Sequence, residues 1–214
     1  MNLPVVVPRW IQMLYPTGMW KMASDEKKLY LTFDDGPHAT ITPQVLDMLR
    51  SFNAKATFFC VGDNVRKNPD IFQRILQEGH TVGNHTYHHL NGWHTEIHRY
   101  AEDVKKADEL IQSPLFRPPY GRVKNSQVKW LHSNGFQLVM WTLLTSDYDQ
   151  HLSQERCAKR VIDKLSPGAI VLFHDGEKAE KNMLFALKKL LQHASSEGYQ
   201  FEAITYKKGS AYKR

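Results

Sequence analysis

The chain has 214 residues, of which 42% are hydrophobic and 23% are charged. This length is enough for one domain with a sizeable core, and the composition excludes a fibrous or low-complexity protein. The formal net charge is +6, but the basic residues are scattered in pairs rather than gathered in a block. A nucleic-acid partner is therefore not expected.

The first 28 residues are predicted to be an irregular lead-in that packs its aromatic side chains, Trp10, Tyr15 and Trp20, on the domain. Prolines interrupt this apolar stretch and no basic segment precedes it, so neither a signal peptide nor a membrane span is predicted. Cys60 and Cys157 lie far apart on different predicted elements. Two unpaired thiols are the default expectation for such a pair.

Strand and helix patterns alternate after the lead-in. Apolar, β-prone runs predict seven strands, over residues 29–35, 55–61, 80–84, 115–118, 137–142, 169–173 and 200–204. Helical spacing with cap and stop residues predicts six helices, over residues 42–52, 68–79, 95–112, 125–135, 153–167 and about 180–197. The first of these begins with Thr42 as its N-cap and Pro43 at its first position.

This alternation predicts parallel strands joined by right-handed crossovers, with both faces of the sheet covered. A closed or nearly closed β/α barrel and an open doubly wound sheet both satisfy the pattern. Polar residues stand at the carboxyl ends of the strands, where β/α barrels gather their catalytic groups. They are Asp34, Asp35, His85, Arg117, Asp147 and His174.

The carboxylate pair Asp34–Asp35 ends the first strand and is followed by Gly-Pro. Two adjacent carboxylates repel each other, so a cation close by is one interpretation and a solvated turn is the other. His85 and His89, spaced four apart, could share one cation from one side of a helical turn, with His88 as a rival partner for His85. One carboxylate and two imidazoles together form the donor set of a catalytic zinc-type site.

Four segments resemble the motifs of the polysaccharide deacetylase family (NodB homology, carbohydrate esterase family 4). They occur in the family's order and are Thr32-Phe33-Asp34-Asp35-Gly36, His85-Thr86-Tyr87-His88-His89, Arg117-Pro118-Pro119-Tyr120-Gly121 and Leu172-Phe173-His174. The resemblance implies a distorted seven-stranded β/α barrel. It also implies a catalytic domain over residues 29–206, between the lead-in 1–28 and a tail 207–214.

By this resemblance, Asp35, His85 and His89 would hold one divalent transition metal, with Zn²⁺ as first choice and Co²⁺ or Ni²⁺ as alternatives. The metal would polarise the acetyl carbonyl and activate water, and Asp34 would be the general base. Arg117 would pair with Asp34, the Tyr120 backbone N–H would stabilise the oxyanion, and His174 would be the general acid. Leu172, Tyr148 and Pro118 would form the substrate pocket.

The fourth motif departs from the family pattern, because Leu144 stands where the family commonly has an aspartate between Trp141 and Asp147. Asp147 can still orient His174. A carboxylate that would support Arg117 is missing unless Asp149 or a water substitutes for it. Tyr148 replaces a tryptophan and alters one wall of the groove. Tyr148, Tyr87, Trp93 and Trp141 are candidates for stacking on sugar faces, although Trp141 equally suits the core.

The resemblance implies a metal-dependent hydrolase that removes acetyl groups from N-acetylated sugars of peptidoglycan or chitin type. Three alternatives are an O-deacetylase of acetylated xylan, a small-molecule amidohydrolase on the same barrel and a non-catalytic glycan-binding module. We expect a monomer with an N-acetylated glycan or oligosaccharide as its partner. Such substrates lie in the cell envelope or periplasm, but the sequence leaves the localisation open and does not exclude the cytoplasm.

Overall fold

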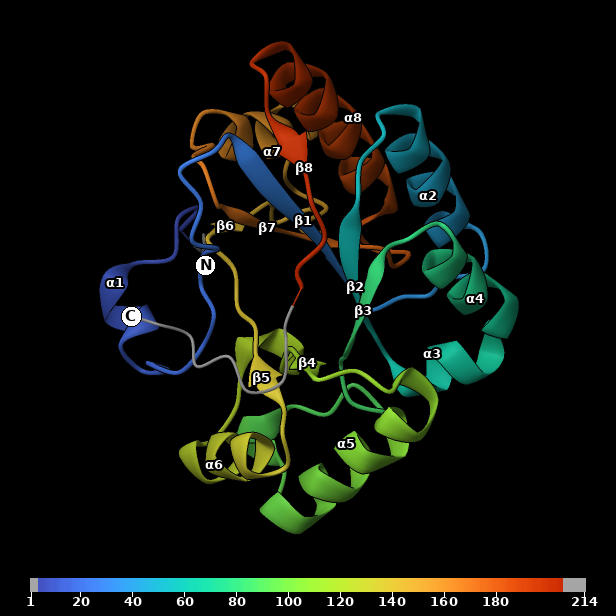
Figure 1. Cartoon of the computed structure of the whole chain (residues 1–214), viewed down its shortest axis with the longest axis vertical. Helices are drawn as coiled ribbons and strands as arrows, with labels where there is room; N and C mark the ends of the chain where they lie inside the picture. Colours follow the sequence, from blue (N-terminus) through green and yellow to red (C-terminus); the bar gives the residue numbers. More distant parts are fainter. Residues whose placement is uncertain (1–3, 206–214) are drawn as a thin grey trace.

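A curled sheet of parallel strands forms the centre of the molecule (Figure 1). The computed structural model describes residues 4–205. The strands are β1 (Lys28–Asp34), β2 (Ala56–Cys60), β3 (Thr81–Asn84), β4 (Leu115–Phe116), β5 (Gln137–Leu138), β6 (Leu143–Leu144), β7 (Ile170–His174) and β8 (Gln200–Phe201). The order β5-β4-β3-β2-β1-β7-β6 winds in one direction, and β8 pairs with the start of β1. The distorted seven-stranded β/α barrel is therefore confirmed, rather than the open doubly wound sheet.

The helices lie on the outside of the curled sheet (Figure 1). They are α1 (Arg9–Gln12), α2 (Ile41–Ser51), α3 (Gly62–Lys67), α4 (Pro69–Gln77), α5 (Ile97–Ile111), α6 (Asn125–Ser133), α7 (Gln154–Ile162) and α8 (Glu180–Ser196). Two short 3-10 helices, η1 (Gly92–His94) and η2 (Pro119–Gly121), follow β3 and β4. Each long helix is apolar on the face that it turns toward the strands, as expected for a layered β/α domain.

The core is densest where β1 meets its two neighbours. β1, β2 and β7 are near-continuously apolar, and Phe33 stacks between Phe58 and Phe173 at ring-centre distances of 5.0 and 5.6 Å. Cys60 and Cys157 are both buried and unpaired, as predicted. This packed centre fixes the ends of the strands and so the positions of the side chains that follow them.

Several predicted boundaries are wrong. Of the strand predicted over residues 137–142, only Gln137–Leu138 form a strand, β5 on β4, and the next strand, β6 on β7, lies beyond the predicted range. The chain crosses from one edge of the curled sheet to the other between them. α2 begins at Ile41, so Thr42 lies inside the helix rather than at its N-cap. α3 was not predicted, since its sequence GDNVRK has almost no apolar period.

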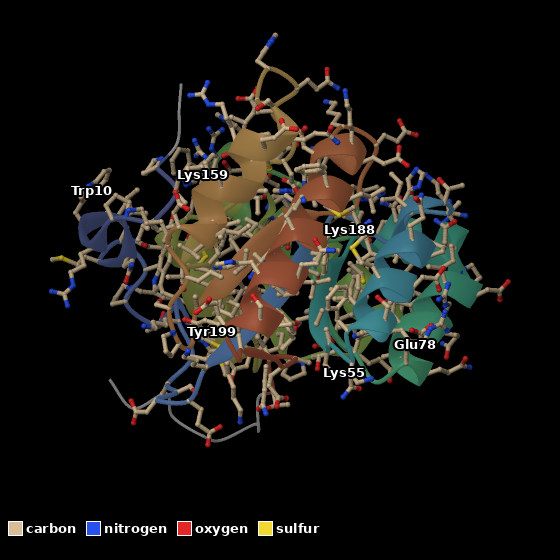
Figure 2. All side chains as sticks on the ribbon, turned by 90° about the horizontal axis from the view of Figure 1, so that it is seen from above. Trp10, Lys55, Glu78, Lys159, Lys188 and Tyr199 are labelled. Atoms are coloured by element: carbon tan, nitrogen blue, oxygen red, sulfur yellow. The ribbon has the colours of Figure 1, made fainter. Side chains whose placement is uncertain are left out.

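The N-terminal segment fills the gap between β5 and β6. The backbone of Met19 bonds to Leu138 and Met140, both at 2.8 Å, and Leu144 donates its N–H to Val5 at 2.8 Å. Tyr15 and Trp20 are buried in this segment. The expectation that Trp10 also packs on the domain is wrong, because its side chain is 65% exposed and projects from the edge of the molecule (Figure 2).

The division into a lead-in and a catalytic domain stays a prediction, and the predicted tail 207–214 lies outside the described residues. Within residues 4–205, none of the helices has the length and apolar character needed to cross a membrane.

Candidate active site

β1 ends on the two acidic side chains at the carboxyl end of the barrel. Asp34 is buried, and its Oδ1 accepts a hydrogen bond from Arg117 Nη1 at 2.8 Å. The backbone of Asp35 is in the left-handed region, with φ at 80°. Asp35 Oδ1 lies 3.1 Å from His89 Nε2 and 3.7 Å from His85 Nε2. Asp34 Oδ2 also lies 3.9 Å from His85 Nε2, so the two carboxylates share this neighbour, but only Asp34 bonds to Arg117 and only Asp35 contacts His89.

The segment that follows β3 carries both histidines in an irregular loop. The predicted helical turn is wrong, because Thr86 and His89 have positive φ angles of 63° and 55°. Asp103 on α5 holds the loop, since its Oδ2 accepts the backbone N–H groups of Tyr87 and His88 at 2.8 and 2.9 Å. This irregular backbone, rather than helical spacing, directs the rings of His85 and His89 toward Asp35.

Asp35, His85 and His89 come close enough together to share one ion, because their ligand atoms all lie within 4.8 Å of one another. His85 Nδ1 lies 2.7 Å from the carbonyl oxygen of Arg117. A carbonyl only accepts, so this nitrogen carries the proton and Nε2 keeps its lone pair free. Burial lowers the pKa of His85 to about 4, so the ring is neutral at neutral pH, as a metal ligand must be. These residues fit a divalent cation.

Asp35 completes this donor set as an anion. Burial opposes its ionisation, but the hydrogen bond with His89 and the charge of His174 hold the pKa of Asp35 well below its ordinary value. His88, the rival histidine, turns away from the cluster. Its Nδ1 lies 2.5 Å from Asp103 Oδ1, and its side chain is 54% exposed.

Arg117 is fully buried beneath Asp34. Besides Asp34, its guanidinium donates to the hydroxyl of Thr32 at 2.8 Å and to the carbonyl oxygens of Val139 at 3.2 Å and Met140 at 2.8 Å. The support that the sequence lacked in Leu144 is therefore supplied by backbone carbonyls and Thr32. Asp149, the predicted substitute, instead accepts the N–H of His151.

His174 ends β7 next to the carboxylate pair, because Asp34 and His174 are register partners on adjacent strands. Its Nδ1 lies 2.8 Å from Oδ1 of Asp147, which is completely buried, and its backbone N–H donates to Oδ2 of the same carboxylate at 2.8 Å. Burial alone would lower the pKa of His174, but the charge and hydrogen bond of Asp147, with the charges of Asp35 and Asp34, raise it to about 9. The ring is protonated at neutral pH.

The two carboxylates of the pair, the two histidines of the loop and His174 line one cavity of about 910 Å³. Leu172, Tyr148 and Tyr120 line it, and Tyr120 places its ring 4.7 Å from that of His89. Trp141 and Tyr87 also line the cavity, whereas Trp93 stands half exposed outside its lining. Pro118 does not line the cavity, although the sequence placed it in the substrate pocket. It is buried, and its carbonyl accepts the N–H of Gly121 at 3.0 Å.

Sequence reasoning missed three residues of the site. Asp175 is completely buried in the cavity wall, where its Oδ2 accepts the hydroxyl of Thr42 at 2.5 Å, and burial raises its pKa to about 7. Asn64 holds the Asp35 backbone, since its Nδ2 donates to the Asp35 carbonyl at 2.7 Å. Asp103 lies on a helix with no motif around it. Only the position of Asp175, next to His174, offered a signal.

Comparisons with known proteins agree with this geometry. The family model described as polysaccharide deacetylase matches residues 21–139. A peptidoglycan-N-acetylglucosamine deacetylase of Bacillus cereus is 36% identical over 200 residues, which cover 90% of this chain and 94% of the relative. A relative of the same activity from Listeria monocytogenes is 36% identical over 188 residues, which cover 85% of this chain and 39% of the relative. The crystal structure of the Bc1960 peptidoglycan N-acetylglucosamine deacetylase superposes with a TM-score of 0.85 at 31% identity, covering 92% of this chain and 95% of that one.

Proposed function

Because this chain belongs to the polysaccharide deacetylase family (NodB homology, carbohydrate esterase family 4), we propose that it hydrolyses the acetamido groups of N-acetylglucosamine units in peptidoglycan. The chain is an enzyme, a hydrolase acting on carbon–nitrogen bonds other than peptide bonds. The substrate is the one in the names of the relatives from Bacillus cereus and Listeria monocytogenes. The observation that carries the proposal is Asp34, a carboxylate outside the three-donor cluster, beside a protonated His174.

We propose that Asp35, His85 and His89 hold one divalent transition metal. Two imidazoles and a carboxylate are a donor set suited to Zn²⁺, with Co²⁺ and Ni²⁺ as alternatives. The free lone pair on His85 Nε2 supports this assignment. When bound, the cation would polarise the acetyl carbonyl and lower the pKa of a water molecule beside it.

The other residues of the site either transfer protons or hold the reacting groups in position. Asp34 takes a proton from the attacking water, and Arg117 holds its carboxylate in place through the 2.8 Å bond. The backbone N–H of Tyr120 donates to the developing oxyanion. His174 gives its proton to the leaving sugar nitrogen, and Asp147 stabilises the imidazolium before the transfer. Leu172 lines the cavity where the acetyl methyl group would lie.

The protonation of His174 favours an N-acetyl over an O-acetyl substrate. An amine is a poor leaving group until it is protonated, so amide hydrolysis depends on an acid that still holds its proton at neutral pH. A pKa of about 9 satisfies that demand. A non-catalytic glycan-binding module would need neither a protonated His174 nor a base such as Asp34 paired with Arg117. The monomeric state stays a prediction.

The test is acetate release from peptidoglycan fragments, chitooligosaccharides and acetylated xylan, with the protein stripped of metal and then reloaded with Zn²⁺. We expect metal-dependent release from the N-acetylated glycans and a loss of about 10²–10⁴-fold in Asp34→Asn, which keeps the shape of the side chain but not its basicity. Asp70→Asn, an exposed carboxylate on α4, is the matched control. Release from xylan alone would identify an O-deacetylase, and no release from any glycan would contradict the proposal.

A further inference from the structure

The rim of the cavity carries two cations without an acidic partner. Within residues 4–205, neither Arg122 nor Lys178 forms an ion pair, and both line the cavity with exposed side chains. Among the rim acids, Asp63 pairs with Arg66 at 2.9 Å and with Lys67 at 2.6 Å, and Glu177 lies 3.5 Å from His38. Arg122 and Lys178 are therefore rim cations that an anionic ligand could reach.

Arg122 lies close to the reacting groups. It stands two residues after Tyr120, whose ring contacts the ring of His89, and residues 120–122 all line the cavity. A ligand group bound by Arg122 would thus belong to the sugar next to the one held at the donor cluster. Lys178 follows β7, which is separated from β4 by three strands in the sheet order, so it lies on a different part of the rim.

The guanidinium of Arg122 makes a cation–π contact with Trp93. Its carbon lies over the indole ring, 5.1 Å from the ring centre. Such a contact leaves N–H groups of the guanidinium available, and a guanidinium matches the two oxygens of a carboxylate.

The backbone beneath this pair is anchored at several points. Arg122 donates its N–H to Pro119 at 3.1 Å and accepts the N–H of Gly92 at 3.2 Å, and the Asn91 side chain accepts the Trp93 N–H at 3.1 Å. These bonds fix the backbone from which the side chains of Arg122 and Trp93 project.

We propose that Arg122, which lies over the ring of Trp93, binds a carboxylate of the sugar that neighbours the reacting N-acetyl sugar. The ligand class is an anionic glycan in which N-acetylglucosamine alternates with a carboxylate-bearing sugar. The proposal rests on the function proposed above and goes further, because it names the residue that selects such a strand over neutral chitin.

The test compares one oligosaccharide in two charge states. A soluble peptidoglycan oligomer of alternating N-acetylglucosamine and N-acetylmuramic acid is assayed with its carboxylates free and after they have been converted to amides. In the wild type, kcat/KM should be about three- to tenfold higher for the free form, and this ratio should shrink as salt is added. In Arg122→Gln the ratio should fall toward one, and Arg122→Lys should restore part of it.

Arg156→Gln is the matched control, because Arg156 on α7 is exposed, does not line the cavity and has no acidic partner in the described part of the chain. It should keep the wild-type ratio. An unchanged ratio in Arg122→Gln, or equal turnover of the two forms by the wild type, would overturn the proposal.

A calorimetric measurement of the binding of both forms separates the two proposals. Failure of the proposed function appears as no acetate from either form. Failure of this inference appears as equal affinity of the protein for the two forms, whether or not they are turned over.

Discussion

The pair Asp147–His174 shows how a single buried charge sets the protonation of the residue next to it. Asp147 has no exposed surface, and both of its oxygens bond to His174, one to the ring and one to the backbone. Burial would deprotonate the imidazole, and the carboxylate reverses that tendency. His174 can act as an acid only while it is protonated, so activity should fall as the pH rises through its pKa.

We therefore expect Asp147→Asn to move the alkaline limb of the kcat/KM profile to lower pH, by about one to three units. The substitution removes the negative charge and keeps the size of the side chain, so the pKa of His174 falls. The profile would be measured between pH 5 and 10 with a peptidoglycan oligomer. Asp163→Asn, an exposed carboxylate paired with Lys159 on α7, should leave the limb in place. An alkaline limb at the same pH in Asp147→Asn would rule out this role.

At the scale of elements, helix α5 supports the loop that carries His85 and His89, although α5 itself provides none of the proposed metal ligands. Asp103 accepts two backbone N–H groups from the loop that carries His85 and His89. The loop also accepts hydrogen bonds from the start of α3, since the N–H groups of Gly62 and Asp63 donate to the carbonyls of Thr86 and Tyr87. The positive φ angles in this loop persist because these contacts hold it.

Asp103→Ala should lower the free energy of unfolding by about 2–4 kcal/mol, because two backbone N–H groups lose a charged acceptor in a buried setting. The affinity for Zn²⁺ should fall as well, since the imidazoles are then less well positioned. Guanidinium unfolding and competition with a chelator measure the two effects. Glu102→Ala, its exposed neighbour on α5, should change either quantity little. Wild-type stability in Asp103→Ala would refute this function of the helix.

At the scale of the whole molecule, the donor cluster joins segments that are far apart in the chain. Asp35 follows β1, whereas His85 and His89 follow β3. Arg117, after β4, bonds to Asp34 through its side chain and to His85 through its carbonyl oxygen. An ion bound there would link strands across the barrel and bind the folded chain only. Ligand binding should then stabilise the fold.

Zn²⁺ at about 100 times its dissociation constant should add about 2.7 kcal/mol of stability and raise Tm by about 5–10 °C in a chain of this length. Thermal unfolding of the stripped protein with and without the metal measures this shift. Asp35→Asn should lose most of it. His193→Ala, on the outside of α8, should retain it. An equal shift in Asp35→Asn would place the metal elsewhere.

The motif residues and the long apolar strands were predictable because their signals are local. β1, β2 and β7 are continuous apolar runs, and the polar residues that end them sit at one edge once parallel strands are assumed. The short elements were less predictable. β5 and β6 merge into one apolar run in the sequence, and only their pairing with different neighbours separates them.

The sequence by itself determined the β/α alternation and which acids and histidines lie at the strand ends. Only the tertiary structure decided how they are supported: carbonyls of residues 139 and 140 around Arg117, Asp103 beneath the histidine loop, and residues 5–22 closing the barrel between β5 and β6. The physical reason is that hydrogen-bond acceptors of the backbone carry no sequence signature. Their positions depend on contacts between segments distant in the chain.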